Sequence, residues 1–217
     1  MNAKIFLLFQ MPIIYSHQIN EATKIGVWHI TEKEDFFLSH VNLQRNITHP
    51  HKRLQHLAGR YLLKELFPNF PISLIEIADT RKPFLQDEAY HFSISHCGDY
   101  AAVIVSTKNR VGVDIEIPHP KIENIKHKFL SEKEQRMLIN EPVANYILFT
   151  MAWSIKEAMF KWYGSVDVDF IKHIEIAHIQ KNNSGFEADC FFKKRNATNI
   201  KVQNISLEGL QLTWLIT

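Results

Sequence analysis

The sequence is short of the features that assign a protein to a class at first sight. Its 2 cysteines are too few for a disulfide framework, and neither belongs to a CxxC pair or to a Cys/His zinc spacing. The net charge of +2 is too small to indicate nucleic-acid binding. No apolar run approaches the ~20 residues that a membrane-spanning helix needs. These absences favour a cytoplasmic protein with reduced thiols that binds neither nucleic acid nor a membrane.

The composition is instead that of an ordinary globular protein, with 46% hydrophobic and 22% charged residues. A chain of 217 residues can form one large domain or two small lobes, and it can bury a sizeable core. No low-complexity tract or obvious linker divides the sequence. The weak positive charge would suit anionic partners.

The N-terminal residues resemble the start of a signal peptide, because Lys4 precedes the apolar run 5–9. Gln10 and Pro12 interrupt this run, however, and no small-residue cleavage site follows it. We therefore predict a surface or sheet-edge strand here. Met11 could also be the true start of the chain.

Hydrophobic periodicity predicts both helices and strands. Apolar residues recur at helical spacing in two long segments, 51–67 and 146–163, and more briefly in 32–40. The capping-box spacing S-x-x-E at 131–134 predicts another helix that runs through Leu138. Strand-like runs occur at 25–30, 73–78, 91–95, 101–106, 111–117, 171–179, 185–192 and 212–216.

The most informative segment is the strand-like run 111–117. Its odd-numbered residues are all β-branched, and its even-numbered residues are Gly112, Asp114 and Glu116. This alternation predicts a half-buried strand with both carboxylates on its open face, roughly 7 Å apart at their Cα atoms. Two neighbouring acids repel each other, so their placement costs stability unless a cation or a partner offsets it. By itself, the pattern is also that of an ordinary solvated strand face.

A third acid lies in the segment 153–161, which we predict to be helical. Glu157 and Lys161 are one turn apart on the same face, a spacing that a simple surface ion pair also has. With Asp114 and Glu116, the chain offers three carboxylates and a lysine. Carboxylates provide the hard oxygen ligands that Mg²⁺ prefers, and a lysine can meet phosphate charge. The combination predicts a magnesium-dependent phosphoryl-transfer site.

Three blocks of sequence, in this order along the chain, resemble the signature of the 4′-phosphopantetheinyl transferases. Residues 81–84 and 92–99 are similar to the family's K-P and F-N-[IL]-S-H-S elements, with Cys97 in place of the commoner serine. The segment 111–117 resembles the G-[IV]-D-[IV]-E block, and 153–161 resembles the W-S-x-K-E-A-x-x-K block.

This resemblance implies an α+β fold of two similar lobes with pseudo-twofold symmetry, and an active site in the cleft between them. The lobes would comprise residues 1–108 and 109–217. Members with much shorter chains assemble as homotrimers, so the length of this chain favours a monomer.

The resemblance also implies a role for each candidate site residue. Asp114, Glu116 and Glu157 would hold Mg²⁺, and Glu157 could act as general base for an incoming serine in addition or instead. Lys161 would contact the pyrophosphate of coenzyme A and stabilise charge on the leaving group. The other expected contacts with coenzyme A are Arg53 and Arg60, from a segment similar to a helix of enterobactin-type members, and Arg81, Lys82, Ser95 and His96.

The implied activity is transfer of the 4′-phosphopantetheine arm of coenzyme A to a serine of an acidic apo-carrier protein, with release of 3′,5′-ADP. The segment 121–137 mixes apolar and basic side chains and is the expected docking surface for the carrier. Lys156 points about 100° away from Glu157 on the helix, so it is either structural or a contact with the carrier.

Other interpretations stay open at this point. One is a non-catalytic module that binds coenzyme A or a carrier protein. Another is a different metal-dependent phosphoryl or nucleotide enzyme, such as a pyrophosphohydrolase. A zinc site at His49, His51 and His56 is disfavoured, because no cysteine or carboxylate lies at a known ligand spacing.

Overall fold

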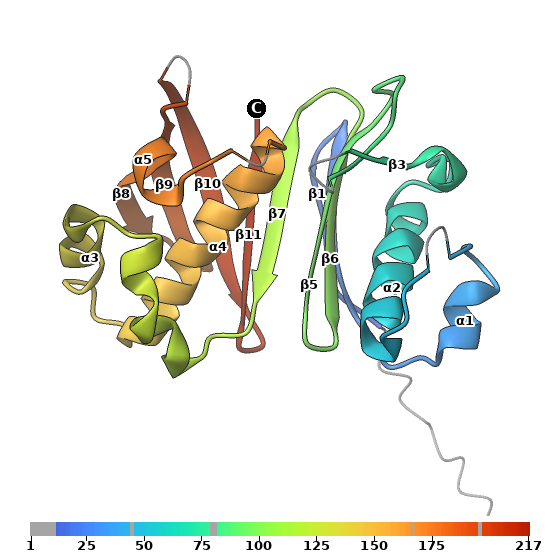
Figure 1. The fold of residues 1–217 in the computed structure, drawn as a ribbon, viewed down its shortest axis with the longest axis horizontal. Helices are drawn as coiled ribbons and strands as arrows, with labels where there is room; N and C mark the ends of the chain where they lie inside the picture. Colours follow the sequence, from blue (N-terminus) through green and yellow to red (C-terminus); the bar gives the residue numbers. More distant parts are fainter. Residues whose placement is uncertain (1–11, 44–45, 79–81, 166, 195–196) are drawn as a thin grey trace, which may run out of the picture.

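The computed structural model describes residues 12–43, 46–78, 82–165, 167–194 and 197–217. Two large antiparallel sheets lie side by side, and one long helix covers a face of each (Figure 1). A third, two-stranded sheet is formed by the short strands β3 and β4. The predictions for the N-terminal run and for Arg81 lie outside the described residues. In the described part of the chain, no helix is both long enough and apolar enough to span a membrane.

The first sheet has the strand order β1-β2-β6-β5 and carries the long helix α2 on one face. Pro50 opens α2, where its missing N–H would have no partner in any case, and the His49 side chain accepts a hydrogen bond from Lys52 N. The elements of this part are β1 (Ile13–Asn20), β2 (Thr23–His29), α1 (Glu34–Leu38), α2 (Pro50–Leu66), η1 (Ile72–Leu74), β3 (Glu76–Ile77), β4 (Pro83–Phe84), β5 (His91–Cys97) and β6 (Tyr100–Ser106).

The second sheet has the order β7-β11-β10-β9-β8 and carries the long helix α4. Gly164 ends α4 in the left-handed conformation, with a φ of 78° that glycine adopts without strain. The elements are β7 (Val111–Glu116), η2 (Pro120–Asn124), η3 (Lys126–Lys128), α3 (Glu132–Leu138), α4 (Asn145–Tyr163), α5 (Phe170–His173), β8 (Ile174–Lys181), β9 (Gly185–Phe192), β10 (Thr198–Leu207) and β11 (Leu210–Ile216).

Three hydrophobic clusters fill the space between these layers. One lies between α2 and the first sheet, and another lies between α4 and the second sheet. The third joins the two sheets and consists of Ile25, Val27, Ala102, Ile104, Val111, Val113, Ile115, Leu210, Leu212 and Trp214. The chain crosses from one sheet to the other over residues 107–110, between β6 and β7. The lobe boundary at 108 and the pseudo-twofold symmetry stay predictions.

The predicted α+β class is confirmed, and most of the predicted elements are present within a few residues of their predicted ends. The sequence analysis missed β1, the two-residue strand β4 and β10. Strand β1 is an edge strand with many exposed residues, so it shows little apolar alternation. Strand β10 carries the buried polar residue Asn204, whose amide donates to Thr213 Oγ1 at 2.9 Å.

Two predicted strands start later than expected. In the segment 73–78, a 3₁₀ turn follows Pro71 and leaves only Glu76–Ile77 as strand. In the segment 171–179, the Asp169 side chain accepts hydrogen bonds from two backbone N–H groups and caps the short helix α5. Both errors come from local turn chemistry that competes with an apolar run.

Helix α4 packs directly on β7, and this changes the surroundings of the acids. The predicted open face of the strand is wrong, because Asp114 is only 2% exposed. A side chain at Gly112 would overlap the carbonyl oxygen of Ala158 and would lie 2.9 Å from Trp162 Cβ. The missing side chain at Gly112 therefore permits the close approach of helix and strand. The even-numbered face of β7 therefore packs against α4, with Gly112 and Asp114 buried and Glu116 half-buried.

Candidate active site

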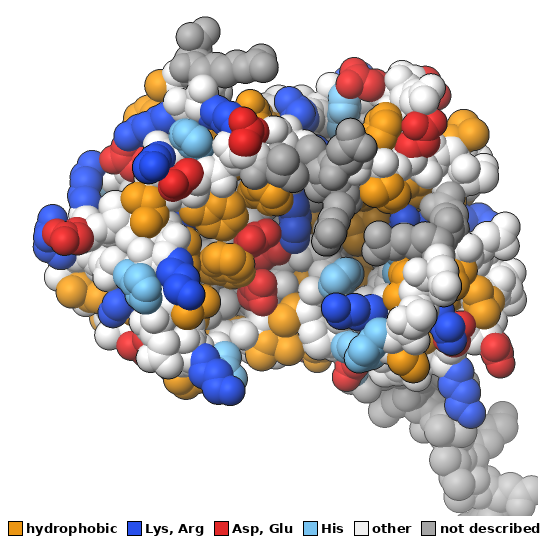
Figure 2. Space-filling view, viewed as in Figure 1, with side chains coloured by type: hydrophobic (Ala, Val, Ile, Leu, Met, Phe, Trp, Pro, Cys, Tyr) orange, Lys and Arg blue, Asp and Glu red, His pale blue; other side chains and the backbone are white. Residues whose placement is uncertain are grey.

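Acidic side chains gather near the middle of the face shown in Figure 2, bordered by hydrophobic, histidine and basic groups. Strand β7 contributes Asp114 and Glu116, and helix α4 contributes Glu157 and Lys161. The contact between β7 and α4 thus brings together four of the residues that the sequence singled out.

Asp114 has two differently placed carboxylate oxygens. Its Oδ1 accepts a hydrogen bond from Lys161 Nζ at 2.5 Å and another from Ser95 Oγ at 2.8 Å. Its Oδ2 is buried and has no hydrogen-bond partner among the described residues. A buried carboxylate oxygen without a partner is costly, and it is an expected ligand atom for a cation.

The negative charges of the other two acids, Glu116 and Glu157, are poorly balanced by nearby positive charge. Burial raises the pKa of Glu157 to about 7; Lys161 opposes this shift, while Asp114 and Glu116 add to it. Burial also raises the pKa of Glu116, and the charge of Asp114 contributes. Trp153 Nε1 donates a hydrogen bond to Glu116 Oε1 at 3.1 Å. One lysine therefore faces three acids, and the surplus negative charge favours a cation.

The donor chemistry of this cluster fits Mg²⁺. Carboxylates are the oxygen ligands that this ion prefers, and Asp114 Oδ2 is free to bind one. In the part of the chain that the structure describes, no three histidine, cysteine or acidic side chains already converge on a single metal position. The cluster therefore has the right chemistry without a closed coordination shell.

Lys82 and Lys161 line the same pocket of about 250 Å³, together with Phe92, Ser93 and Phe160. Lys82 Nζ donates to the carbonyl oxygen of Trp162 at 3.2 Å, and burial with the nearby Arg110 lowers its pKa to about 8. A larger pocket of about 460 Å³ adjoins this one and is lined by both Lys82 and Arg110. The two pockets put basic groups beside the acidic cluster.

Sequence reasoning missed Arg110, which precedes β7 and donates a hydrogen bond to the carbonyl oxygen of Tyr163 at 2.8 Å. It also stacks over the Trp162 ring, with 5.5 Å between its guanidinium carbon and the ring centroid. Its position directly before the acidic strand was the one available signal.

The two arginines of α2 are held by other groups. Arg53 forms an ion pair with Glu34 at 2.7 Å and would have to leave it to bind a phosphate. Arg60 is only 5% exposed, and its guanidinium contacts His56 Nδ1 at 3.0 Å. A guanidinium buried in this way does not face solvent, so Arg60 is not placed to bind a phosphate of coenzyme A.

The remaining candidates of the first sheet are on β5. Ser95 is buried beside Asp114, whereas His96 is exposed. The histidines of the disfavoured zinc site have other partners. His49 caps α2, and His51 Nε2 contacts Asp99 Oδ1 at 2.9 Å.

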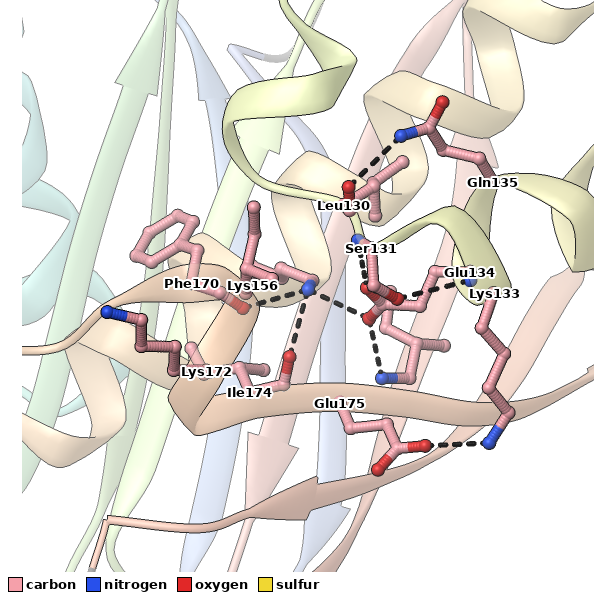
Figure 3. A network of polar contacts seen from close by, with 12 residues as sticks. Leu130, Ser131, Lys133, Glu134, Gln135, Lys156, Phe170, Lys172, Ile174 and Glu175 are labelled. Atoms are coloured by element: carbon pink, nitrogen blue, oxygen red, sulfur yellow. Dashed lines mark hydrogen bonds and ion pairs between the residues drawn. The ribbon is translucent and has the colours of Figure 1, made fainter.

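Lys156 is structural, which was one of its two predicted roles. Figure 3 shows its ammonium group at the centre of a polar network with Glu134, Phe170 and Ile174. It contacts Glu134 Oε1 at 2.8 Å and donates to the carbonyl oxygens of Phe170 and Ile174, both at 2.9 Å. Glu134 also completes the predicted capping box with Ser131. Lys156 is fully buried, so it does not face a partner protein.

The expected docking segment 121–137 is only partly available. Phe129 is 1% exposed and packs against the Trp153 ring, with 5.1 Å between ring centroids. Ile125 is 38% exposed. Any docking role of this segment therefore falls to its exposed apolar and basic side chains.

Comparison with known proteins points to one family. Residues 110–214 match the family described as the 4′-phosphopantetheinyl transferase superfamily. A putative 4′-phosphopantetheinyl transferase of Haemophilus influenzae is 30% identical over 132 residues, which are 58% of this chain and 56% of the relative. The 4′-phosphopantetheinyl transferase AcpT of Escherichia coli K12 is 29% identical over 143 residues, covering 61% of this chain and 72% of the relative.

A third relative, the 4′-phosphopantetheinyl transferase psf-1 of Bacillus pumilus, is 32% identical over 109 residues. These cover 48% of this chain and 46% of that protein. The chain thus matches about half the length of the Haemophilus and Bacillus relatives. The matched family segment begins directly before β7 and includes Asp114, Glu116, Glu157 and Lys161.

Proposed function

Because the chain belongs to the 4′-phosphopantetheinyl transferase superfamily, we propose that it transfers the 4′-phosphopantetheine arm of coenzyme A to a serine of an acidic apo-carrier protein. The proposal includes Mg²⁺ as cofactor, a monomeric protein and a cytoplasmic location. The observation that carries it is the cluster of buried Asp114 with the half-buried Glu116, Glu157 and Lys161, beside two pockets lined by basic groups.

Asp114, Glu116 and Glu157 are the residues that would hold the cation. When bound, Mg²⁺ would neutralise negative charge on the pyrophosphate of coenzyme A and on the departing 3′,5′-ADP. Asp114 Oδ2 supplies the oxygen that lacks another partner.

The lysines would bind the anionic substrate. Lys161 and Lys82 line one pocket, so their ammonium groups can both face the phosphates of coenzyme A. Arg110 extends this positive surface into the neighbouring pocket. Exposed His96 and Arg53, once it leaves Glu34, remain candidates for further phosphate contacts.

Glu157 is suited to accept the proton of the carrier serine. A general base works best when its pKa lies near the operating pH, and in the metal-free protein burial brings the pKa of Glu157 to about 7. The serine oxygen would then attack the β-phosphorus and form the new P–O bond. The bond from this phosphorus to 3′,5′-ADP breaks, and the leaving group takes the electron pair.

The direct test is intact-protein mass spectrometry of a panel of apo-carrier proteins incubated with this protein, coenzyme A and Mg²⁺. We expect one carrier to gain the mass of one phosphopantetheine, with 3′,5′-ADP released in equal amount. Glu157→Gln should abolish the gain, and Glu132→Gln should not, because Glu132 is 89% exposed at its side chain. Hydrolysis of coenzyme A without transfer, or binding without any product on the whole panel, would contradict the proposal.

A further inference from the structure

Ser95 lies at the point where the two sheets meet, and all the hydrogen-bonding capacity of its hydroxyl is occupied. Its Oγ donates to Asp114 Oδ1 at 2.8 Å. It accepts from Lys161 Nζ at 2.8 Å and from the backbone N–H of Ile115 at 3.3 Å. A serine hydroxyl has one hydrogen to donate and two lone pairs that accept, so these three bonds exhaust it.

This saturation conflicts with the expectation that Ser95 binds a phosphate of coenzyme A. A phosphate oxygen would need the hydroxyl hydrogen, which already goes to Asp114. The side chain is also only 5% exposed. Binding a phosphate would leave a buried carboxylate oxygen with one bond fewer, at a cost comparable to the bond gained.

The neighbouring Ser93 provides an internal comparison. It projects from the same face of β5, two residues earlier, and its Oγ accepts a hydrogen bond from Val113 N at 3.2 Å. Both serines therefore bridge β5 to the edge of β7. Among the residues that the structure describes, Ser93 Oγ has no hydrogen bond to an acid or a lysine, so of the two serines only Ser95 combines the bridging contact with a bond to Asp114.

The two carboxylate oxygens of Asp114 therefore have different surroundings. Ser95 and Lys161 both bind Oδ1 and prevent the carboxylate from rotating freely. Oδ2 is left buried and without a partner among the described residues. Hydrogen bonds to one oxygen of a ligating carboxylate commonly orient the other oxygen toward the metal.

We propose that Ser95 is a positioning residue, whose hydroxyl anchors Asp114 Oδ1 and Lys161 so that Asp114 Oδ2 faces the divalent cation. The inference rests on the proposed function for the presence of that cation. It assigns Ser95 a task in cation binding and leaves the coenzyme A phosphates to the basic residues and His96.

The test is a titration of the full chain with Mn²⁺, followed by electron paramagnetic resonance of the free ion, without coenzyme A or carrier. Loss of a hydrogen-bond partner behind a metal ligand typically weakens metal affinity by roughly 10- to 100-fold. We expect Ser95→Ala to weaken Mn²⁺ binding by about tenfold. Ser93→Ala removes a similar bridge between the sheets and should leave Mn²⁺ affinity unchanged.

A second variant guards against simple misfolding. Ser95→Cys keeps the side-chain volume but forms weak hydrogen bonds, so it must also weaken Mn²⁺ binding. Wild-type affinity in either Ser95 variant, an equal loss in Ser93→Ala, or no Mn²⁺ binding by the wild type would overturn the inference.

Steady-state kinetics separate this role from a phosphate contact. A positioning role raises the Mg²⁺ concentration needed for half-maximal rate, with the KM for coenzyme A nearly unchanged at saturating Mg²⁺. A phosphate contact raises the KM for coenzyme A instead, and that result would contradict the inference. The Mn²⁺ titration needs no turnover, so it is informative even if no carrier protein is modified and the proposed function fails.

Discussion

Glu157 illustrates how a single half-buried side chain links stability to chemistry. Its pKa is raised from 4.5 to about 7, mainly by burial. As pH rises from 4.5, the unfolded chain loses this proton first, and the native state holds it until about pH 7. Because the native state binds more protons in this interval, the free energy of unfolding falls as pH rises. The ionised carboxylate therefore destabilises the metal-free protein above neutral pH.

Replacement of this acid should accordingly stabilise the metal-free protein while removing activity. We expect Glu157→Gln to raise the free energy of unfolding by roughly 1–3 kcal/mol at pH 8, because each unit of pKa shift corresponds to about 1.4 kcal/mol. The gain should vanish near pH 4, where the wild-type carboxyl is protonated in both states. Urea unfolding in the presence of a chelator, at both pH values, measures this difference.

Glu132→Gln is the matched control, because this exposed glutamate carries no such burial cost. A stability gain of Glu157→Gln that is the same at pH 4 and pH 8 would show that the effect does not come from the charge of Glu157.

At the level of elements, the network around Glu134 holds α4 against α3 and β8. Glu134 accepts four hydrogen bonds: two from Ser131, one from Ile176 N and one from Lys156. Lys156 in turn uses its three donors on Glu134 and on two backbone carbonyls. Every polar atom of the pair is satisfied, so the helix that carries the catalytic candidates has one preferred position.

Removing one partner of the Lys156–Glu134 pair should strongly lower the free energy of unfolding. Lys156→Met leaves the Glu134 carboxylate buried without its cation, and we expect a loss of about 3–5 kcal/mol in the free energy of unfolding. Lys133→Met serves as the control, because Lys133 is 72% exposed at its side chain and its ion pair with Glu175 lies at the surface. The control should lose far less stability than Lys156→Met, because an exposed, solvent-screened ion pair contributes little. Equal losses in the two variants, measured by urea unfolding, would refute the structural role of Lys156.

The sequence was informative about elements and less so about contacts between them. The alternation in 111–117 placed Asp114 and Glu116 on one strand face, and helical spacing placed Glu157 and Lys161 together. The bond between Ser95 and Asp114 could not be predicted, because it depends on how β5 and β7 approach each other without pairing. The burial of Asp114 was not predicted, because α4 can approach β7 closely only where Gly112 has no side chain.

At the scale of the whole molecule, the cluster between the sheets makes the two halves depend on each other. Strands β2 and β6 of the first sheet and β7 and β11 of the second contribute its buried aliphatic and aromatic side chains. Separating the sheets would expose this apolar surface to water, which is unfavourable in proportion to its area. We therefore expect the chain to unfold in one cooperative transition.

Tryptophan fluorescence and far-UV circular dichroism in urea should give coincident unfolding curves. Trp28 reports on the first sheet, whereas Trp162 and Trp214 report on the second half. The variant Trp28→Phe makes the fluorescence specific to the second half, and its curve should still coincide with circular dichroism. Two separated transitions would show that the halves fold independently.

The pairing of β7 has a consequence for synthesis on the ribosome. Its strand partner is β11, and Asp114 lies opposite Thr213, almost a hundred positions further along the chain. Until β11 has emerged from the exit tunnel, β7 lacks its strand partner, although its N–H groups at Val113 and Ile115 can still donate to the hydroxyls of Ser93 and Ser95. The second sheet therefore reaches its full strand order only after β11 has been synthesised, when every strand of the first sheet has already emerged.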